Sequence, residues 1–279
     1  MAKKSQKEKA QLFRSLHSGS PILVLPNVWD AASARIFELA GFGAVATTSS
    51  GVAATYGQPD GQHISKEALI STTAYVAEAI DCPVSVDLEA GYGRDIAEVV
   101  QTVKAVVEAG AVGINIEDSS KGANRALVDI AYQVELIQAL RQLGETLDIP
   151  FVINARIDAF LLTTDDPASV SEQAIKRGNA YRQAGADCLY PIGPSRVDIV
   201  TRLVQGIEGP VNILARPKSP TIPELANLGV ARVSFGGGLM HAVLGQLNLI
   251  AQELFTQGTY QHIAESSSAF AGFNSLWPE

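Results

Sequence analysis

The stretch SVDLEAGYG (85–93) closes an apolar run with two carboxylic acids, Asp87 and Glu89, which are followed by two glycines. Side chains two residues apart on a β-strand point to the same side of it. Two carboxylates in one site repel each other and raise a pKa unless a cation lies between them. The spacing therefore predicts a cation-binding site where this strand ends.

Acids and one arginine also end the neighbouring apolar runs. Glu117 and Asp118 end the next run, Asp60 lies in the loop after the second run, and Arg156 ends a later run. A cluster that offers only oxygen ligands suits a hard cation. We therefore predict Mg2+, with Mn2+ as an alternative. Arg156 offers a bidentate fork to a substrate carboxylate or phosphonate. A structural network of ion pairs is the competing interpretation.

Hydroxyl groups gather after the second apolar run. Thr48, Ser49 and Ser50 precede Gly51, and their hydroxyl and backbone N–H groups are able to hold a carboxylate or phosphate. The same residues also fit an ordinary polar strand end. Tyr92, beside the glycines of the opening stretch, is a further candidate donor to the site.

A loop with three polar side chains follows Glu117. Lys121, Asn124 and Arg125 are candidates for a mobile lid, because Gly122 gives the segment freedom to close over a ligand. A solvated turn explains them equally well. The four histidines are expected at the surface or in packing positions: His17, His63, His241 and His262.

These side chains need elements that bring them together. Short runs rich in Val and Ile alternate with stretches of helical periodicity, several of which begin at Asp or Ser and end at Gly. We predict strands at 22–28, 44–50, 83–90, 112–118, 151–158, 188–193, 210–215 and 232–237. The repetition predicts an α/β fold, a (β/α)8 TIM barrel with the candidate residues at its C-terminal face. A doubly wound sheet is the competitor, but PNVWDAAS after the first strand is no GxGxxG turn.

The bulk composition limits the class of protein. The chain has 279 residues, of which 47% are hydrophobic and 18% charged, and this fits one domain over residues 1–279. A net charge of −8 argues against a nucleic acid or an anionic membrane as partner and favours a small molecule. Cys82 and Cys188 lack zinc or redox spacing and are expected to be reduced thiols.

The two chain ends predict location and packing. The basic N-terminal segment reads as a helix without the apolar stretch of a secretory signal, so we expect a soluble, cytoplasmic protein. The tail from about 259 to 279 carries Phe270, Phe273 and Trp277 in a polar setting. These rings are expected to pack on the barrel or on a neighbouring subunit.

Four motifs in order, TTSSGVAATYGQPD, VDLEAGYG, NIEDS and NARIDAF, resemble those of the isocitrate lyase/phosphoenolpyruvate mutase superfamily. The likeness covers roughly residues 20–245. It implies a (β/α)8 barrel whose eighth helix is often exchanged between subunits, in a homodimer or homotetramer. It also implies chemistry that breaks or forms a C–C or P–C bond beside a pyruvate unit, through an enolate in many members.

The resemblance also implies roles for single residues. The acids that match Asp87, Glu89 and Glu117 gather around Mg2+, some through water, and the acid that matches Asp60 lies close by. The segment matching Thr48, Ser49 and Ser50 grips the substrate's carboxylate end, and the arginine matching Arg156 binds its other anionic group. Asn212 is a weaker match to a polar residue at the end of strand seven.

The loop after Glu117 departs from the lyases of this superfamily. Isocitrate and methylisocitrate lyases carry a Lys-Lys-Cys-Gly-His type motif there, whose cysteine handles the proton at the enolate carbon. The loop DSSKGANRALVD has neither Cys nor His. Phosphoenolpyruvate mutases use an asparagine in a longer gating loop, to which Asn124 corresponds.

The leading hypothesis is an Mg2+-dependent lyase or decarboxylase that cleaves a C–C bond of a small 2-oxo or 2-hydroxy di- or tricarboxylate. The first alternative is P–C chemistry on phosphoenolpyruvate or phosphonopyruvate, by a mutase or hydrolase. The second is a barrel that binds a keto acid without turning it over. The sequence does not name the substrate, because pocket shape and loop contacts decide specificity.

Overall fold

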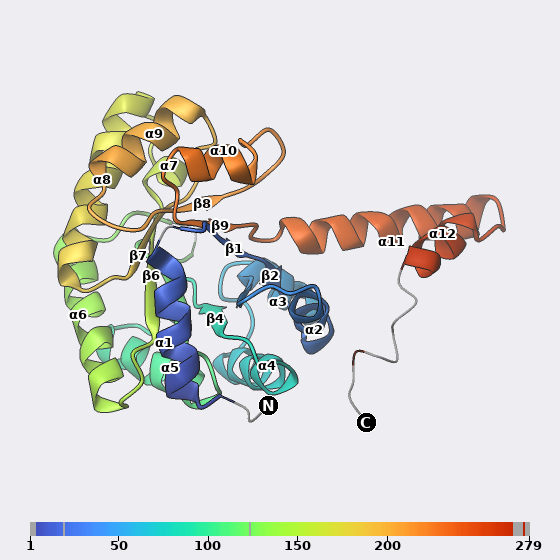
Figure 1. The fold of residues 1–279 in the computed structure, drawn as a ribbon, viewed down its shortest axis with the longest axis horizontal. Coiled ribbons are helices and arrows are strands. Elements are labelled where there is room, and N and C mark those ends of the chain that lie inside the picture. The colour runs from blue at the N-terminus through green and yellow to red at the C-terminus, as the bar shows by residue number, and fades with distance from the viewer. Residues whose placement is uncertain (1–3, 19, 123, 270–275, 277–279) are drawn as a thin grey trace.

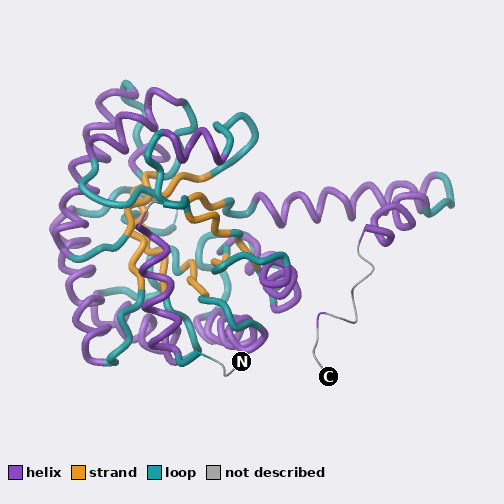
Figure 2. Tube along the Cα trace, in the orientation of Figure 1, coloured by secondary structure: helices purple, strands orange, loops and turns teal. Residues whose placement is uncertain are grey.

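The computed structural model describes the whole chain apart from residues 1–3, 19, 123, 270–275 and 277–279. Parallel strands lie in the centre and helices surround them (Figures 1 and 2). The strands are β1 (Leu23–Leu25), β2 (Asn27–Val28), β3 (Val45–Thr47), β4 (Val84–Asp87), β5 (Gly113–Glu117), β6 (Val152–Ile157), β7 (Cys188–Pro191), β8 (Asn212–Leu214) and β9 (Arg232–Ser234).

Helices follow the strands in the βα alternation that the sequence predicts. The helices are α1 (Gln6–Ser15), the 3-10 turn η1 (Leu16–Ser18), α2 (Ala31–Leu39), α3 (Ser49–Thr55), α4 (Lys66–Ala79), α5 (Ile96–Glu108), α6 (Ile130–Thr146), α7 (Ala159–Leu162), α8 (Pro167–Ala184), α9 (Val197–Gly206), α10 (Ile222–Asn227), α11 (Gly238–Thr256) and α12 (Gln261–Ala269). Asp and Ser side chains cap several of them, and α8 ends at Gly185 with a left-handed backbone at φ 113°.

The strands form two parallel sheets that together make a ring. One sheet has the order β2-β3-β4-β5-β6-β7 and the other the order β1-β9-β8. β1 and β2 are one strand interrupted at Pro26, which has no N–H to donate. On the opposite side a bridge between Leu189 and Val211 links β7 to β8. The predicted (β/α)8 barrel is therefore confirmed, with eight strands in the predicted order.

Several predicted strands end earlier than expected, and two of these differences affect the site. The strand predicted at 44–50 stops at Thr47, because Ser49 and Ser50 already form the first turn of α3. The strand predicted at 83–90 stops at Asp87. Glu89 lies beyond it with φ 51°, a left-handed conformation outside the strand region. Strand alternation therefore does not direct the Glu89 side chain, and that part of the prediction is wrong.

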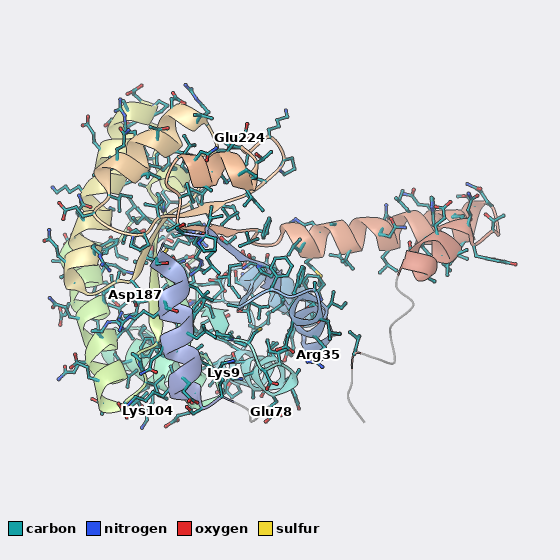
Figure 3. All side chains as sticks on the ribbon, in the orientation of Figure 1. Lys9, Arg35, Glu78, Lys104, Asp187 and Glu224 are labelled. Carbon is teal, nitrogen blue, oxygen red and sulfur yellow. The ribbon has the colours of Figure 1, made fainter. Side chains whose placement is uncertain are left out.

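α1 closes the end of the barrel where the strands begin. Its Ala10 and Phe13 side chains are fully buried, so the predicted basic N-terminal helix has an apolar face. A Cβ atom on Gly113 would lie 2.5 Å from Phe13 Cε1, which is why β5 begins with glycine there. Arg14 pairs with Asp187 beside β7 at 2.7 Å. Figure 3 labels Asp187 next to α1. These contacts anchor the first helix.

His17 follows α1 and is buried, with Nδ1 2.8 Å from the Phe13 carbonyl oxygen. Burial, together with the nearby Arg232, lowers the pKa of His17 from 6.5 to about 4. The unfolded chain therefore binds a proton near pH 6.5 that the folded chain does not bind until about pH 4, so stability falls as the pH falls through this window. The expected packing role of His17 agrees with its burial.

We predict that His17→Asn removes this part of the acid sensitivity. The wild type should lose about 3 kcal/mol of unfolding free energy between pH 7 and pH 4 through this histidine alone. Urea denaturation of both proteins at pH 7, 5.5 and 4 measures the difference. The exposed His241→Asn is the control and should follow the wild type. Equal pH dependence of His17→Asn and the wild type would contradict the assignment.

α11 leaves the barrel as a long arm that ends in α12 (Figure 1). Large apolar side chains are exposed on it, among them Leu247 at 58% and Phe255 at 92%. α12 begins within the predicted tail, whereas Phe270, Phe273 and Trp277 lie outside the described residues.

Two further sequence-based expectations concern cysteines and membranes. Cys82 and Cys188 are free thiols. Across the described segments, no helix combines the length and the apolar character needed to cross a membrane. The expected cytoplasmic location stays a prediction.

Candidate active site

Two adjoining cavities open where β4, β5 and β6 end. The outer cavity has a volume of about 420 Å3 and the inner one about 290 Å3. Both are lined by Ser49, Asp60, Arg125 and Arg156. They lie at the C-terminal end of the strands, the face at which barrel enzymes carry their active sites. The structure thus brings most of the predicted site residues to one place.

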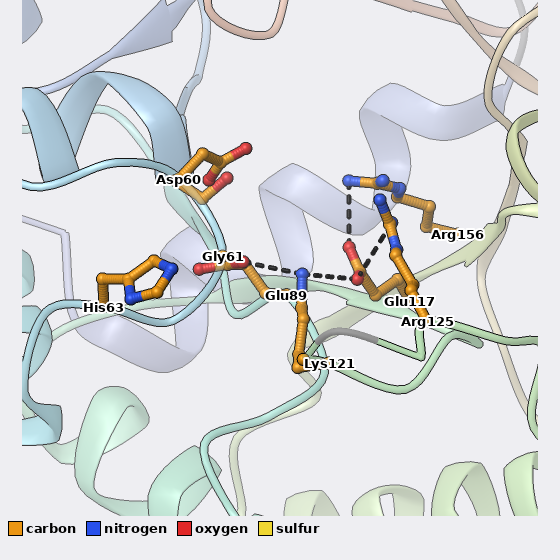
Figure 4. Close-up of a pocket in the computed structure, with 10 residues that line it drawn as sticks. Asp60, Gly61, His63, Glu89, Glu117, Lys121, Arg125 and Arg156 are labelled. Atoms are coloured by element: carbon orange, nitrogen blue, oxygen red, sulfur yellow. Dashed lines mark hydrogen bonds and ion pairs between the residues drawn. The ribbon is translucent and has the colours of Figure 1, made fainter.

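A lysine joins two buried acids in the outer cavity. Lys121 Nζ lies 2.7 Å from Glu89 Oε2 and 2.6 Å from Glu117 Oε1, as Figure 4 shows. Burial raises the pKa of Glu89, and the Lys121 ammonium opposes this effect. Burial works to lower the pKa of Lys121, but the Glu117 and Glu89 carboxylates outweigh it and raise that pKa. A cation therefore does lie between two carboxylates, and the protein supplies it.

The turn after β4 directs the Glu89 side chain. Glu89 Oε1 accepts hydrogen bonds from the Gln62 backbone N–H at 2.9 Å and from the Tyr92 hydroxyl at 3.3 Å. Tyr92 also has a positive φ, 54°, next to Gly91. A Cβ atom on Gly91 would lie 2.5 Å from Val99 Cγ1, so the turn packs tightly on α5. Tyr92 is therefore a neighbour of Glu89, as predicted for a donor, although it does not line either cavity.

Arg156 lies between two buried carboxylates. Its Nε donates to Asp158 Oδ1 at 2.6 Å, and its Nη1 lies 3.0 Å from Glu117 Oε2. That oxygen receives no hydrogen bond of good geometry within the described part of the chain. Burial works to lower the pKa of Arg156, but Glu117 and Asp158 outweigh it and raise that pKa, so the guanidinium is charged.

Arg125 joins the same network from the loop after β5. It donates to Asp158 Oδ2 and to Ser119 Oγ, and it lies 3.4 Å from Glu117 Oε1. Together with Lys121 it ties this loop to the strand ends. The lid interpretation of the loop and the ion-pair interpretation of the acids are thus both consistent with the geometry. Lys121 and Arg125 do not fit a solvated turn, because both cations contact buried acids.

Asp87 faces the inner cavity, so it and Glu89 line adjoining cavities rather than one. Its carboxylate accepts from the Ser49 backbone N–H at 3.1 Å and from Asn115 Nδ2 at 2.9 Å. Thr48 Oγ1 and Ser50 Oγ lie 3.2 Å apart on the same wall. The predicted hydroxyl cluster therefore lies directly beside Asp87.

The remaining predicted site residues, Asp60, Asn124 and Asn212, differ in their burial and in their relation to the cavities. Asp60 is exposed and lines both cavities. Asn124 is exposed and is not part of either wall, where its neighbour Arg125 lies instead. Asn212 is fully buried and donates to Ser234 Oγ at 3.1 Å, behind the inner cavity wall. Their proposed roles remain predictions.

The sequence interpretation missed several wall residues, among them a histidine, a tyrosine and an arginine. His63 is exposed, in agreement with the expected surface position, and it also lines the outer cavity beside Gly61 (Figure 4). Tyr190 and Arg232 line the inner cavity and come from β7 and β9. Alternation along RVSFGG, applied as it was to Asp87, would have directed Arg232 and Ser234 inward together. No local signal distinguished His63.

The arrangement has the donor chemistry of a hard-cation site. Asp87, Glu89 and Glu117 supply only oxygen atoms, and Lys121 already holds positive charge between two of them. Among the described residues, no three His, Cys, Asp or Glu side chains converge closely enough to hold a metal on their own. Mg2+ tolerates such a site, because it commonly keeps several waters and takes one or two carboxylates plus substrate oxygens.

Comparison with known proteins places the chain in a family. The family model of phosphoenolpyruvate phosphomutase matches residues 13–255. A crystal structure from Burkholderia cenocepacia J2315, described as that of a candidate lyase/mutase, is 36% identical with a TM-score of 0.87, and the match covers 97% of this chain and 95% of that one.

Two more distant proteins have named activities. 2-Methylisocitrate lyase of Halalkalibacterium halodurans is 26% identical over 268 residues, 92% of this chain and 86% of that protein. A phosphonopyruvate hydrolase solved with oxalate and Mg2+ is 23% identical with a TM-score of 0.83, and the match covers 96% of this chain and 94% of that one. The latter likeness shows the shared fold. The chain belongs to the phosphoenolpyruvate phosphomutase family, and so to the isocitrate lyase/phosphoenolpyruvate mutase superfamily that its four motifs indicate.

Proposed function

We propose that the protein is an Mg2+-dependent lyase or decarboxylase that cleaves a C–C bond of a small 2-oxo or 2-hydroxy di- or tricarboxylate through a pyruvate-type enolate. The observation that carries this proposal is that Asp87, Glu89, Glu117 and Arg156 meet at one barrel mouth. There the Lys121 ammonium lies between Glu89 and Glu117. The similarity to 2-methylisocitrate lyase supports the reaction class.

Asp87, Glu89 and Glu117 would hold Mg2+, in part through water. Their oxygen chemistry fits the ion, and the Lys121 ammonium shows that this position stabilises positive charge. When bound, Mg2+ supplies Lewis-acid stabilisation of the negative charge that develops on the substrate's carbonyl oxygen. The phosphonopyruvate hydrolase with Mg2+ and oxalate supports the choice of ion.

The other residues bind and orient the substrate. The Thr48, Ser49 and Ser50 segment offers hydroxyl and N–H donors to the carboxylate end, next to Asp87. Arg156, which lines the same cavity, presents its charge to the second anionic group. The loop with Lys121 and Arg125 excludes water when it closes on the acids. Tyr92 holds Glu89 through its hydroxyl, and Asp60 lies at the entrance to both cavities.

P–C bond chemistry is the second candidate function. It shares the proposed metal site and differs in the group that Arg156 and Arg125 face. The phosphonopyruvate hydrolase of the same fold favours it, and so does the missing lyase cysteine. A phosphonate pocket should bind sulfopyruvate much more tightly than oxalate, whereas the lyase proposal expects no such preference. A binding protein without turnover is the third candidate.

The test is pyruvate release, coupled to lactate dehydrogenase, from oxaloacetate, methylisocitrate and phosphonopyruvate. Each substrate is assayed with Mg2+ and with EDTA, and Glu89→Ala is assayed beside the wild type, because Mg2+ alone decarboxylates oxaloacetate. Release that needs both Mg2+ and Glu89 supports an enzyme and distinguishes C–C from P–C cleavage. No release above the variant from any of the three would remove both enzymatic candidates in the form stated here.

We also propose that the α11 arm mediates a homodimer or homotetramer by exchange between subunits. Its exposed apolar side chains support this, because leaving them in water is unfavourable. We predict that Leu247→Glu shifts the protein to a monomer in size-exclusion chromatography with light scattering. Gln252→Glu, at an exposed polar position of the same helix, is the control and should leave the assembly intact. A monomeric wild type would remove the proposal.

A further inference from the structure

One arginine in the barrel interior has no acidic partner. Arg232 is 2% exposed, and within the described residues it forms no ion pair with a carboxylate. Its Nη1 lies 3.4 Å from His17 Nε2, and its Nε has no hydrogen-bond partner in the described part of the chain. His17 is neutral at pH 7, because its pKa is about 4. Burial of an unpaired guanidinium is costly, so this charge needs a counter-ion.

Arg232 differs in this respect from the other cations of the two cavities. Lys121, Arg125 and Arg156 each contact buried carboxylates. Their charge is largely compensated before any ligand binds. Arg232 lines the inner cavity with its charge uncompensated by direct contact, and burial lowers its pKa. Cys188, Tyr190 and Asp87 act on Arg232 electrostatically. Burial raises the pKa values of Cys188 and Tyr190 to about 12, so both are neutral at pH 7. Asp87 accepts hydrogen bonds from Ser49 and Asn115 and forms no ion pair with Arg232 among the described residues.

The inner cavity connects Arg232 with the proposed substrate site. Arg232 is the first residue of β9, paired with the first residues of β1 and β8, whereas Asp87 is the last residue of β4. The same cavity of about 290 Å3 is lined by both of them. It therefore extends from the barrel mouth toward the end where the strands begin. Its volume approaches the lower limit of ordinary small-molecule sites, about 300 Å3.

The walls between these ends are polar, although the interior of such barrels is usually filled by branched apolar residues. Ser85 Oγ lines the cavity and has no hydrogen-bond partner among the described residues. The oxygens of Asn154 and Asn212 also lack one there. Buried polar atoms are normally satisfied, so these groups need water or a ligand in the interior.

We propose that Arg232 forms a second anion subsite at the deep end of the inner cavity, and that this subsite binds a carboxylate of the substrate remote from the reacting end. The inference rests on the proposed function, in which the first substrate carboxylate binds at Ser49, next to Asp87. It narrows the substrate class to dicarboxylic 2-oxo acids. Ser85 offers a second donor to the bound carboxylate, and water satisfies the asparagine oxygens. In such a dicarboxylate Arg232 takes the second anionic group in place of Arg156, whose charge Glu117 and Asp158 already compensate.

Two ligands that differ in one carboxylate test the subsite. With Mg2+, calorimetry should show that the wild type binds 2-oxoglutarate at least about ten times more tightly than 2-oxopentanoate, the effect of one charge-assisted hydrogen bond. Arg232→Met should lose the preference and Arg232→Lys should keep part of it. Arg196→Met, at an exposed arginine, should behave as the wild type. The proposal is overturned if Arg232→Met still prefers 2-oxoglutarate. It is also overturned if the wild type binds oxalate but does not prefer 2-oxoglutarate.

Two further measurements complete the experiment: the Tm of the ligand-free proteins and the change in Tm on addition of acetate. Arg232→Met should not lower the Tm of the ligand-free protein, because it removes an unpaired buried charge; a large drop would show a structural role. If it fails to fold, Arg232→Lys carries the test. Acetate that raises the Tm of the wild type without Mg2+, but not that of Arg232→Met, supports the subsite. If the wild type shows this acetate effect but no preference for 2-oxoglutarate, the assignment of the subsite to the substrate is overturned. Failure of oxalate to bind with Mg2+ contradicts the proposed function instead, while the acetate result still tests Arg232.

Discussion

Replacement of Arg156 by methionine is expected to lower the unfolding free energy by about 3 kcal/mol, the order found when a buried ion pair loses one partner. The side chains of Glu117 and Asp158 are fully buried, and Arg156 contacts both. Arg156 Nη1 lies 3.0 Å from Glu117 Oε2, and among the described residues that oxygen receives no hydrogen bond of good geometry. Its negative charge would remain buried without that partner. Urea denaturation at pH 7 measures the loss.

An exposed arginine provides the matched control. Arg196 pairs with Asp198, and the two side chains are 72% and 60% exposed. Arg196→Met should cost no more than about 1 kcal/mol, because water screens such a pair. Equal losses for the two variants would show that burial does not set the strength of the Arg156 network. Arg156→Met should also weaken oxalate binding, since it removes the charge that faces the substrate.

Replacement of Asp87 by asparagine is expected to weaken Mg2+ binding by on the order of 100-fold and to abolish Mg2+-dependent turnover. The substitution removes one negative charge from the proposed metal site but keeps the size of the side chain. Asn115 and the Ser49 backbone N–H donate to Asp87, so one of these hydrogen bonds is retained. Calorimetric titration of Mg2+ in the presence of oxalate measures the affinity.

Asp118→Asn is the control for this experiment. Asp118 is equally an acid at the end of a central strand, but it accepts hydrogen bonds from Tyr181 at 2.7 Å and from Arg177 at 3.1 Å, outside both cavities. We expect Asp118→Asn to lower stability by about 3 kcal/mol and to leave Mg2+ affinity unchanged. Unchanged Mg2+ affinity in Asp87→Asn would remove Asp87 from the metal site. Equal loss in both variants would point to a general effect on the barrel.

The sequence alone determined the fold and the rim on which the site lies. Runs of Val and Ile separated by helical periodicity specify eight βα units, and parallel strands in a closed ring must end on the same face. Asp87, Glu117 and Arg156 come directly at strand ends, so their convergence follows from local pattern plus topology. The motifs around them were specific enough to indicate the superfamily, because the residue types and their order both matched.

Only the tertiary structure decided which side chains meet. Glu89 turns on a left-handed backbone, so its direction depends on the packing of Gly91 against α5 and not on strand alternation. Lys121 reaches Glu89 across 32 residues of sequence, and Arg232 reaches the cavity of Asp87 from the last strand of the barrel. Local sequence fixes backbone preferences over a few residues, whereas such contacts depend on loop paths and ring closure, which the whole chain determines at once.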